Sequence, residues 1–511
     1  MSWPGAALLS LSDKEGAAEF ARTLAAHGTR ILASGGTAKH LEGAGVAVTA
    51  VESLTGFGEM LGGRVKTLHP HVHAPILARR GREEDLEELR SRDLAPIDLV
   101  AVTLYPFESR ARQLDDAGAV EEIDIGGVAL LRAAAKNSES VIVIHDPSQY
   151  REVLAALEAG GPDPSQRRAW AVRAFARTAR YDGAIASELA RRNEPGSPAP
   201  AYYHLDLERI RTLRYGENPH QAAALYARTG DATRLEAWKE GRELSYNNLL
   251  DLESAVSLVS RFHDAACVIV KHGQPCGAAC GANAGDAYRR ALASDPLSAF
   301  GGIVALNRSL DADVARALGD QFLECITAPE LEAGALDLLK SKKNLRVVRL
   351  TSRDVESDDG WSLRLAGRWG LMERGSANAA PEWRVVTKRA PSVDERAGLE
   401  FAWEIAAAAR SNAIAIARGA QLIGLGSGQT SRVDAVDVAL MKARRAGHDV
   451  KGGGIASDGF FPFADNIEHA AEAGITAVVQ PGGSVRDDEV IAACDRLGVA
   501  MLFTDRRTFR H

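Results

Sequence analysis

The feature that most constrains the fold is the alternation of short apolar segments with helical periodicity in the N-terminal part of the chain. Strand-like and helix-like segments follow one another at Ala6–Leu11, Glu15–His27, Thr29–Ala33, Ala38–Ala44, Leu99–Leu104, Val128–Lys136 and Ser140–His145. Short buried strands that alternate with helices form parallel sheets covered on both faces. The sequence therefore predicts an α/β fold.

The length of the chain requires more than one hydrophobic core. For 511 residues, two or three domains are expected. The segment Arg191–Ala201 (RRNEPGSPAPA) is rich in Pro, interrupts both periodic patterns and is predicted to be a linker. We therefore predict two domains, residues 1–198 and 199–511.

The second domain also shows α/β alternation. Its predicted strands include Cys267–Val270, Gly302–Ala305, Leu422–Leu425 and Thr476–Val479. The domain is long enough for two subdomains, and no tandem repeat is visible in its sequence. Residues 330–390 are expected to be irregular and rich in charge.

Charge and hydropathy exclude several classes of protein. The net charge of -7 gives no reason to expect nucleic acid or an anionic membrane as a partner. The N-terminus does not resemble a signal peptide, and no apolar run approaches the ~20 residues of a membrane span. The cysteines are too few and too irregularly spaced for a disulfide framework, so a cytoplasmic location is expected.

Two glycine-containing loops in the first domain suit an anionic ligand. Ser34-Gly35-Gly36-Thr37 lies between a predicted strand and a helix, where backbone amides and the helix dipole bind phosphate. On its own, such a motif is more often a plain βα turn. Gly62–Pro70 combines glycines with two cations, a Thr and a His, which a solvated basic loop explains only in part.

A third loop, Ile123–Gly127, precedes the helix that ends at Lys136. Its amides are suited to hold an oxyanion, and Asp124 and Lys136 are candidates for an acid/base pair. The same two charges would also complement the helix dipole. The residues alone leave both interpretations open.

In the second domain, Lys271 and His272 follow the predicted strand Cys267–Val270. The carboxyl end of a buried strand is where α/β folds place ligand-binding and reactive side chains. A His transfers protons near neutral pH, and an adjacent cation stabilises developing negative charge. The polar loops Leu213–Gln221 and Leu244–Asp251 are further candidates for ligand contact.

Patterns for bound cofactors are incomplete. His69, His71 and His73 have no Cys or nearby carboxylate to complete a metal site, and Cys276 and Cys280 lack the spacing of the zinc deaminases. A Gly-x-Gly-x-Gly run in the second domain lacks the last glycine of a dinucleotide fingerprint. We therefore expect no zinc and no nicotinamide.

The order of these motifs resembles that of one enzyme family. In the first domain the matching stretches are Ser10–Lys14, Ser34–Lys39, Gly62–Pro70, Leu104–Phe107 and Ile123–Asn137. In the second they are Leu213–Gln221, Leu244–Asp251, Lys271–Gly277, Ser294–Gly302, Glu324–Pro329, Val386–Arg389, Ser411–Ile414, Gly426–Arg432, Ser457–Phe463, Pro481–Ser484 and Phe509–His511. Over essentially its whole length the chain resembles the bifunctional aminoimidazole carboxamide ribonucleotide (AICAR) formyltransferase/inosine monophosphate (IMP) cyclohydrolase family of purine synthesis.

The resemblance implies a fold and a reaction for each domain. The N-terminal domain is expected to be a methylglyoxal-synthase-like parallel sheet, and the C-terminal domain to consist of two cytidine-deaminase-like subdomains. The expected reactions are formyl transfer from 10-formyltetrahydrofolate to AICAR, giving formyl-AICAR (FAICAR), and dehydrative closure of FAICAR to IMP. The family is typically a homodimer, and whether this chain binds potassium is left open.

The resemblance also implies roles for individual residues. For formyl transfer the expected catalytic residues are Lys271, His272, His220 and Asn412, and for cyclisation they are Lys66, Tyr105, Asp124 and Lys136. Expected nucleotide contacts are Ser10, Ser12, Lys14, Ser34, Gly35, Gly36, Thr37, Arg64, Thr67, Ile125, Gly126, Gly127, Arg214, Tyr215 and Arg507. Expected folate contacts are Glu324, Arg432, Phe460 and Asp465.

Four positions depart from the family pattern, namely Pro75, Thr103, Gln274 and Gly459. Thr103 and Gln274 lie beside expected catalytic residues. Two alternatives to the bifunctional enzyme are a formyltransferase whose first domain only binds nucleotide, and a phosphate-sensing module fused to a scaffold. The expected catalytic residues are present in both domains, which argues against each alternative.

Overall fold

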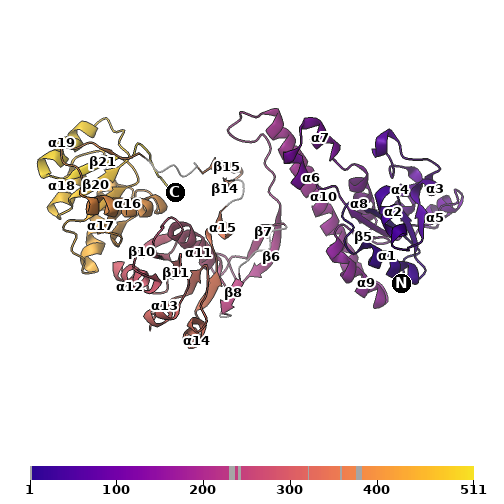
Figure 1. The fold of residues 1–511 in the computed structure, drawn as a ribbon, viewed down its shortest axis with the longest axis horizontal. Helices are drawn as coiled ribbons and strands as arrows, with labels where there is room; N and C mark the ends of the chain where they lie inside the picture. Colours follow the sequence, from indigo (N-terminus) through magenta and orange to yellow (C-terminus); the bar gives the residue numbers. More distant parts are fainter. Residues whose placement is uncertain (1–2, 230–235, 240–242, 320, 357–359, 376–381) are drawn as a thin grey trace. The chain divides into compact units, whose positions relative to one another are not determined.

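The computed structural model describes residues 3–229, 236–239, 243–319, 321–356, 360–375 and 382–511. The chain divides into two compact units, residues 1–206 and residues 207–511 (Figure 1). The functional boundary after residue 198 stays a prediction.

The first unit is built on a five-stranded parallel sheet with the strand order β3-β2-β1-β4-β5. The strands are β1 (Ala6–Leu11), β2 (Arg30–Ala33), β3 (Val48–Ala50), β4 (Leu99–Thr103) and β5 (Ile142–Ile144). Nearly every residue of β1 and β4 is buried, as expected of a sheet covered on both faces. The predicted parallel α/β sheet is confirmed.

Helices connect these strands and surround the core. They are α1 (Ala17–Ala26), α2 (Gly35–Gly43), α3 (Val51–Thr55), η1 (Leu61–Gly63), α4 (Pro70–Leu77), α5 (Glu83–Arg90), α6 (Phe107–Arg110), η2 (Ala111–Gln113), α7 (Asp116–Glu121), α8 (Gly126–Lys136), η3 (Pro147–Gln149), α9 (Tyr150–Glu158) and α10 (Pro164–Asn193). The prediction that the linker begins at Arg191 is wrong, because α10 continues to Asn193. The helix ends there because Glu194 precedes a proline and takes a non-helical conformation, with φ -129° and ψ 64°.

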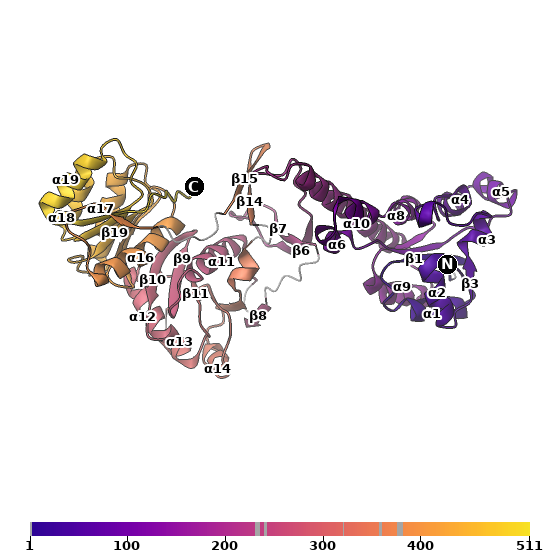
Figure 2. The same cartoon turned by 45° about the horizontal axis from the view of Figure 1, so that its top comes forward.

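The second unit contains two six-stranded mixed sheets, with the orders β10-β9-β11-β12-β13-β8 and β16-β21-β20-β19-β17-β18. Their strands are β8 (Glu236–Lys239), β9 (Ala266–Lys271), β10 (Gln274–Cys280), β11 (Ile303–Leu306), β12 (Cys325–Ala328), β13 (Arg346–Arg349), β16 (Arg384–Val385), β17 (Ile414–Ala417), β18 (Leu422–Gly426), β19 (Gly454–Ser457), β20 (Ala477–Gln480) and β21 (Ala500–Phe503). The helices are α11 (Tyr246–Val259), α12 (Ala284–Ser294), α13 (Ala312–Ala317), α14 (Ala335–Leu339), α15 (Ser352–Val355), α16 (Val393–Ala408), α17 (Arg432–Arg445), α18 (Asp465–Glu472) and α19 (Asp487–Leu497). One cluster of buried residues draws on both sheets and on α11 and α16, so the sheets share a core (Figure 2).

The two mixed sheets repeat one arrangement of strands. In each, a hairpin (β9–β10 or β17–β18) is antiparallel to the next strand, three strands then run parallel, and the far edge strand is antiparallel. The sequence shows no tandem repeat because the two halves share topology rather than residues. Two similar halves agree with the expected subdomains, whose cytidine-deaminase-like character stays a prediction.

Two antiparallel ribbons complete the second unit. They are β6 (Leu207–Leu213) with β7 (Ala223–Arg228), and β14 (Trp361–Ala366) with β15 (Trp369–Arg374). The prediction of irregular structure over residues 330–390 is wrong for α14, β13 and α15, and also for the second ribbon. Cross-strand apolar pairs such as Leu363 with Met372 favour strands there despite the surrounding charges.

Candidate active sites

In the first unit, the glycine turn and the basic loop lie together at the carboxyl ends of the strands. Ser34 is the N-cap of α2, so the turn forms the start of that helix. A Cβ atom placed on Gly35 would lie 3.2 Å from Lys66 Nζ, and one on Gly36 would lie 4.0 Å from Lys14 Cε. Two cations therefore lie against the predicted phosphate turn, where backbone amides already favour an anion.

Two buried threonines hold the loops around this turn. The Thr37 hydroxyl donates to the Leu11 carbonyl (3.2 Å) and accepts from the Leu11 amide (2.9 Å), which ties β1 to α2. The Thr103 hydroxyl accepts from the Asp13 amide (2.8 Å) and donates to the Asp13 carbonyl (3.1 Å). Thr103, one of the departures from the family pattern, thus fixes the loop that follows Ser12 at the end of β1.

Lys66 forms an ion pair with Glu59, with 2.9 Å between Nζ and Oε2. The pKa of Lys66 is raised, chiefly because Glu59 accepts a hydrogen bond from it, and the Tyr105 phenol adds to the effect. Its neighbour Thr67 reaches the third loop, because a Cβ on Gly126 would lie 2.8 Å from Thr67 Oγ1. The basic loop therefore lies between the phosphate turn and the predicted oxyanion loop.

Asp124 is held at the start of α8 by its side chain and by its backbone. The Asp124 Oδ1 atom accepts from the Gly127 amide (2.7 Å). The Asp124 backbone amide donates to the Tyr181 hydroxyl (2.9 Å), and that hydroxyl donates to the Glu122 carbonyl (3.1 Å). Burial raises the pKa of Asp124, while hydrogen bonds from the amides of Gly127 and Tyr105 oppose the rise. A buried carboxyl with a raised pKa is suited to proton transfer, and this one already accepts from one of the three amides of the predicted oxyanion loop.

Lys136 is the last residue of α8 and lies far from Asp124. The helix has 11 residues, and a rise of ~1.5 Å per residue separates its ends by about 15 Å. One chain therefore does not bring Asp124 and Lys136 together as an acid/base pair, and the role of Lys136 stays a prediction.

In the second unit, Lys271 is the last residue of β9 and His272 lies in the turn to β10. Asp251 on α11 holds this turn, because its Oδ1 accepts from the Gly273 amide (2.6 Å) and its Oδ2 from the His272 amide (3.3 Å). Burial raises the pKa of Asp251, and these two amides oppose the rise. Lys271 Nζ donates to the Phe300 carbonyl (2.7 Å), so both predicted catalytic side chains stand at an anchored turn.

Gln274 connects the same turn to Asn412. Its Oε1 accepts from the amide of Arg410 (3.0 Å), two residues before Asn412. The Asn412 carboxamide accepts from Arg432 Nη2 (2.6 Å) and donates to the Gln429 carbonyl (2.9 Å). The orientation of the Asn412 amide is thereby fixed, and its contact with substrate stays a prediction.

Arg432 lies behind Asn412, and its side chain is only 7% exposed. Its Nη1 donates to Ser457 Oγ (2.7 Å) and to Asp458 Oδ1 (2.6 Å), and Asp458 also accepts from the Ser411 hydroxyl (2.6 Å). The side chains of Asn412, Ser457 and Asp458 therefore already accept hydrogen bonds from the Arg432 guanidinium. Its contact with folate stays a prediction.

The first turns of α11 join two further predicted site segments. Asn247 Nδ2 donates to the Glu217 carbonyl (3.3 Å) in the loop that carries His220, and Asn248 Nδ2 donates to Glu324 Oε2 (2.7 Å). This loop, Glu324 and the Lys271–His272 turn are therefore all bound to one helix. No described contact joins His220 directly to His272.

Exposed cations near the remaining predicted contacts stack on aromatic rings. The Arg214 guanidinium lies 5.1 Å from the centre of the Tyr215 ring, and that of Arg507 lies 4.6 Å from the Phe509 ring. A Cβ on Gly459 would lie 2.7 Å from Phe509 Cε1. An alanine there would require the Phe509 side chain to shift.

The other two predicted folate contacts lie on the segment that follows Gly459. Phe460 is 42% exposed, and Asp465 is the first residue of α18. Asp465 Oδ1 accepts from the Asn466 side chain (2.7 Å), which holds the carboxylate at the helix start. Both side chains remain predictions for folate.

Within the described residues, no three His, Cys, Asp or Glu side chains lie together as metal ligands would. The same residues contain no helix long and apolar enough to cross a membrane. All five cysteines are buried, free thiols, and burial raises the pKa of Cys276 to about 12.

Comparisons with known proteins cover both units. Residues 16–129 match the family described as MGS-like domain, and residues 134–442 match that described as AICARFT/IMPCHase bienzyme. Proteins named bifunctional purine biosynthesis protein PurH align along the whole chain. The one from Acidithiobacillus ferrooxidans is 46% identical over 99% of this chain and 99% of its own length. Those from Chloroflexus aurantiacus and Persephonella marina are 48% and 44% identical over 99% of this chain, and over 98% and 99% of their own lengths.

These matches and the two α/β units define the chain as a bifunctional enzyme with an MGS-like N-terminal domain. It belongs to the AICARFT/IMPCHase bienzyme family. The predicted fold class and family are confirmed. The individual site residues stay predictions.

Sequence reasoning missed the residues that hold the site loops from behind. Asp251 and Asp458 lie inside stretches that match the family, but nothing in the sequence assigns a role to either. Tyr181 lies within a helix, outside all of these stretches. A polar side chain on the apolar face of a helix, as Tyr181 is on α10, was the available signal.

Proposed function

We propose that this chain catalyses the last two steps of IMP synthesis. The first step transfers a formyl group from 10-formyltetrahydrofolate to AICAR, and the second closes FAICAR to IMP with loss of water. The observation that carries the proposal is that each unit holds an anchored cluster of acid/base side chains, in a chain that belongs to the bienzyme family.

For formyl transfer we assign the chemistry to the β9–β10 turn. The AICAR amine is a poor nucleophile because its lone pair is delocalised, so orientation and proton transfer carry most of the catalysis. His272 takes the amine proton, and Lys271 stabilises the tetrahedral oxyanion or protonates the leaving folate nitrogen. Asn412 orients the substrate and His220 assists His272. The fixed amide of Asn412 and the bond from Lys271 to the Phe300 carbonyl support these roles.

For cyclisation the carboxamide nitrogen attacks the formyl carbon and water leaves. Lys66, Tyr105 and Asp124 move the protons, and the amides of Ile125–Gly127 hold the oxyanion. The raised pKa of Asp124 in its buried position supports a proton-transferring role. Lys136 belongs to the same predicted set and would act from the far end of α8.

Binding of the substrates follows the same division between the units. In the first unit the nucleotide contacts are Ser10, Ser12, Lys14, Ser34, Gly35, Gly36, Thr37, Arg64 and Thr67, and in the second they are Arg214, Tyr215 and Arg507. The activity requires a folate co-substrate, and we assign its contacts to Glu324, Arg432, Phe460 and Asp465. Assembly as a homodimer and a cytoplasmic location remain part of the proposal.

Two reciprocal substitutions test the assignment of activities to units. His272→Ala should abolish formyl transfer and leave cyclisation of supplied FAICAR unchanged, because the two clusters lie on separate units. Lys66→Ala should have the opposite effect. Each variant is the control for the folding of the other, with tetrahydrofolate and IMP resolved by chromatography. Formyl transfer by His272→Ala, or undiminished cyclisation by Lys66→Ala, would refute the respective role.

A further inference from the structure

The short helix α7 lies between two parts of the proposed cyclohydrolase site. Its last residue, Glu121, forms an ion pair with Arg64 of the basic loop and accepts from Arg64 Nε at 3.3 Å. Two residues beyond α7 the chain enters Ile123–Gly127, the loop with the predicted oxyanion amides. The placement of α7 therefore affects both Arg64 and the oxyanion loop.

Apolar packing alone does not hold α7 in place. It has six residues, one of them Gly118, and Ala119 is its one buried side chain. The side chain of Asp115 caps it by accepting from the Gly118 amide (2.8 Å). A helix this short is not stable by itself, so polar contacts from outside must fix its position.

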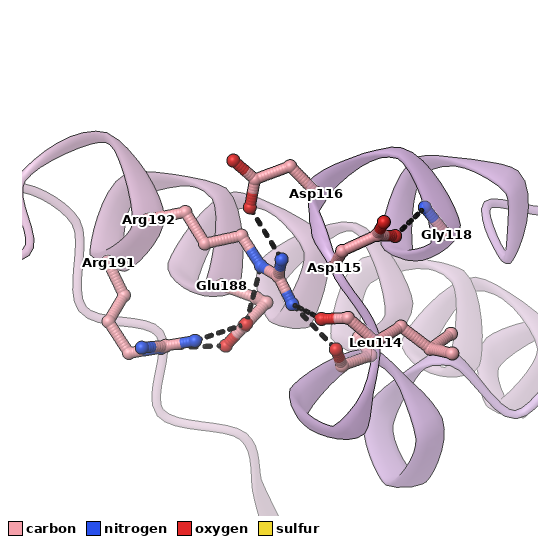
Figure 3. Close-up of polar contacts among 8 residues, drawn as sticks. Leu114, Asp115, Asp116, Gly118, Glu188, Arg191 and Arg192 are labelled. Carbon is pink, nitrogen blue, oxygen red and sulfur yellow. Dashed lines mark hydrogen bonds and ion pairs between the residues drawn. The ribbon is translucent and has the colours of Figure 1, made fainter.

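Arg192, in the last turn of α10, supplies those contacts (Figure 3). Its Nη2 donates to the carbonyls of Ala111 (2.6 Å) and Leu114 (3.0 Å), and its Nη1 donates to the Asp116 carboxylate (2.6 Å). Its Nε donates to Glu188 Oε1 (2.8 Å), which aims the guanidinium at the segment before α7. Three bonds from one planar group, with the fourth to Glu188 holding that group in place, fix the segment in position and direction.

Arg191 also binds Glu188, as Arg192 does, but none of its described hydrogen bonds reaches the segment before α7. It donates to both carboxylate oxygens of Glu188, at 3.0 and 2.6 Å (Figure 3). Its side chain is 58% exposed, against 12% for that of Arg192. The two arginines therefore form a natural pair for comparison. Substitution of either weakens the ion pairs of Glu188, but only that of Arg192 releases the α7 segment.

We propose that Arg192 is a positioning residue for the cyclohydrolase reaction, which acts by clamping the segment from Ala111 to Asp116. Through α7 it places Arg64 and the oxyanion amides, although it touches neither. A displacement of reacting groups by about 1 Å costs up to ~100-fold in rate. The contribution of Arg192 should therefore appear in turnover rather than in stability alone. This inference rests on the proposed cyclohydrolase function.

The test compares Arg192→Gln, Arg192→Lys and Arg191→Gln in the full chain. We expect Arg192→Gln to lower kcat for cyclisation of FAICAR about 10-fold relative to Arg191→Gln. KM should rise only through Arg64, one of several proposed nucleotide contacts, whereas kcat should change more because the oxyanion amides act in the transition state. Arg192→Lys should recover only part of the rate, since one ammonium cannot reach all four acceptors. Formyl transfer should be the same in all three variants.

Equal cyclisation rates for Arg192→Gln and Arg191→Gln would overturn the clamp, whereas no cyclisation by the unsubstituted protein would refute the proposed function itself. If Arg192→Gln does not fold, Asp116→Ala provides a second variant. The Asp116 side chain is 86% exposed, so its loss removes one contact of the clamp with little effect on folding. It should reduce cyclisation about 2-fold or more, and an unchanged rate would also overturn the clamp.

Discussion

His272 has a backbone φ of 55°, in the left-handed region that side chains other than glycine seldom occupy. Hydrogen bonds from the backbone amides of His272 and Gly273 to the Asp251 carboxylate stabilise this conformation. It turns the chain back from β9 into β10. A catalytic side chain on a strained turn depends on the contact that maintains the strain. Asp251 therefore helps to fix the position of His272.

Asp251→Ala should lower kcat for formyl transfer about 10-fold while cyclisation by the first unit stays unchanged. Asp251→Asn should retain more activity because its remaining oxygen still accepts from one of the two amides. Initial rates of tetrahydrofolate release measure the effect, and FAICAR cyclisation by the same samples is the control. Full formyl transfer by Asp251→Ala would show that the turn holds without this carboxylate.

At the level of residues, the sequence predicts the groups that stand in contiguous motifs but not those that support them. Lys271 and His272 are predicted because their residue types and their place after a strand suggest chemistry. Tyr181 is 57 positions from the Asp124 amide that it binds, and only the folded helix brings the two together. The contacts of Thr103 with Asp13 and of Gly459 with Phe509 likewise join positions that are remote in sequence.

Helix α16 in the second unit begins with a charged cap. The Ser392 hydroxyl accepts from the Glu395 amide (3.2 Å), and Glu395 accepts from the Ser392 amide (2.8 Å) and from both terminal nitrogens of Arg389 (2.9 Å each). Burial alone would raise the pKa of Glu395, but the hydrogen bonds from Arg389, Thr476 and Ser392 outweigh it and lower the pKa from 4.5 to about 2. The ionised form is therefore the one that stabilises the helix start.

This shift predicts how the stability of the second unit depends on pH. Because the folded-state pKa lies below the ordinary value of 4.5, the contribution of Glu395 is complete above pH 4.5 and is lost as the pH falls toward 2. Glu395→Gln should lower Tm at pH 6 and show a smaller further loss on acidification than the unsubstituted protein. Differential scanning calorimetry between pH 6 and pH 3 measures both.

Glu400→Gln on the same helix is the matched control for this prediction. Glu400 pairs with Arg396 on the surface, with its side chain 55% exposed, and such pairs contribute little to stability. Parallel pH profiles for Glu395→Gln and the unsubstituted protein would contradict the account of the cap.

At the level of elements, the strands of the first sheet are predicted well because each is a short apolar run between helices. Ends of elements are predicted less well. Helix α10 extends into the expected linker because contacts such as those of Arg192 support its last turn. The β14–β15 ribbon was missed because its charged residues hide the cross-strand apolar pairs.

The whole chain combines two units with different topologies, each with its own predicted cluster of catalytic groups. The second unit repeats one mixed-sheet arrangement, and its predicted site takes Lys271 and His272 from one half and Asn412 from the other. Such a site requires the shared core between the sheets. Family resemblance predicts this organisation, while composition and periodicity alone predict only α/β domains.

The most direct test of the account is a single incubation of the purified chain with AICAR and 10-formyltetrahydrofolate, with all products resolved by chromatography. We predict that tetrahydrofolate and IMP appear in equal amounts. FAICAR should accumulate in place of IMP, with tetrahydrofolate still released, only when the first unit carries Lys66→Ala. Release of tetrahydrofolate with FAICAR but without IMP from the unsubstituted protein would contradict the cyclohydrolase assignment. No turnover of the folate would contradict the formyltransferase assignment and with it the bifunctional account.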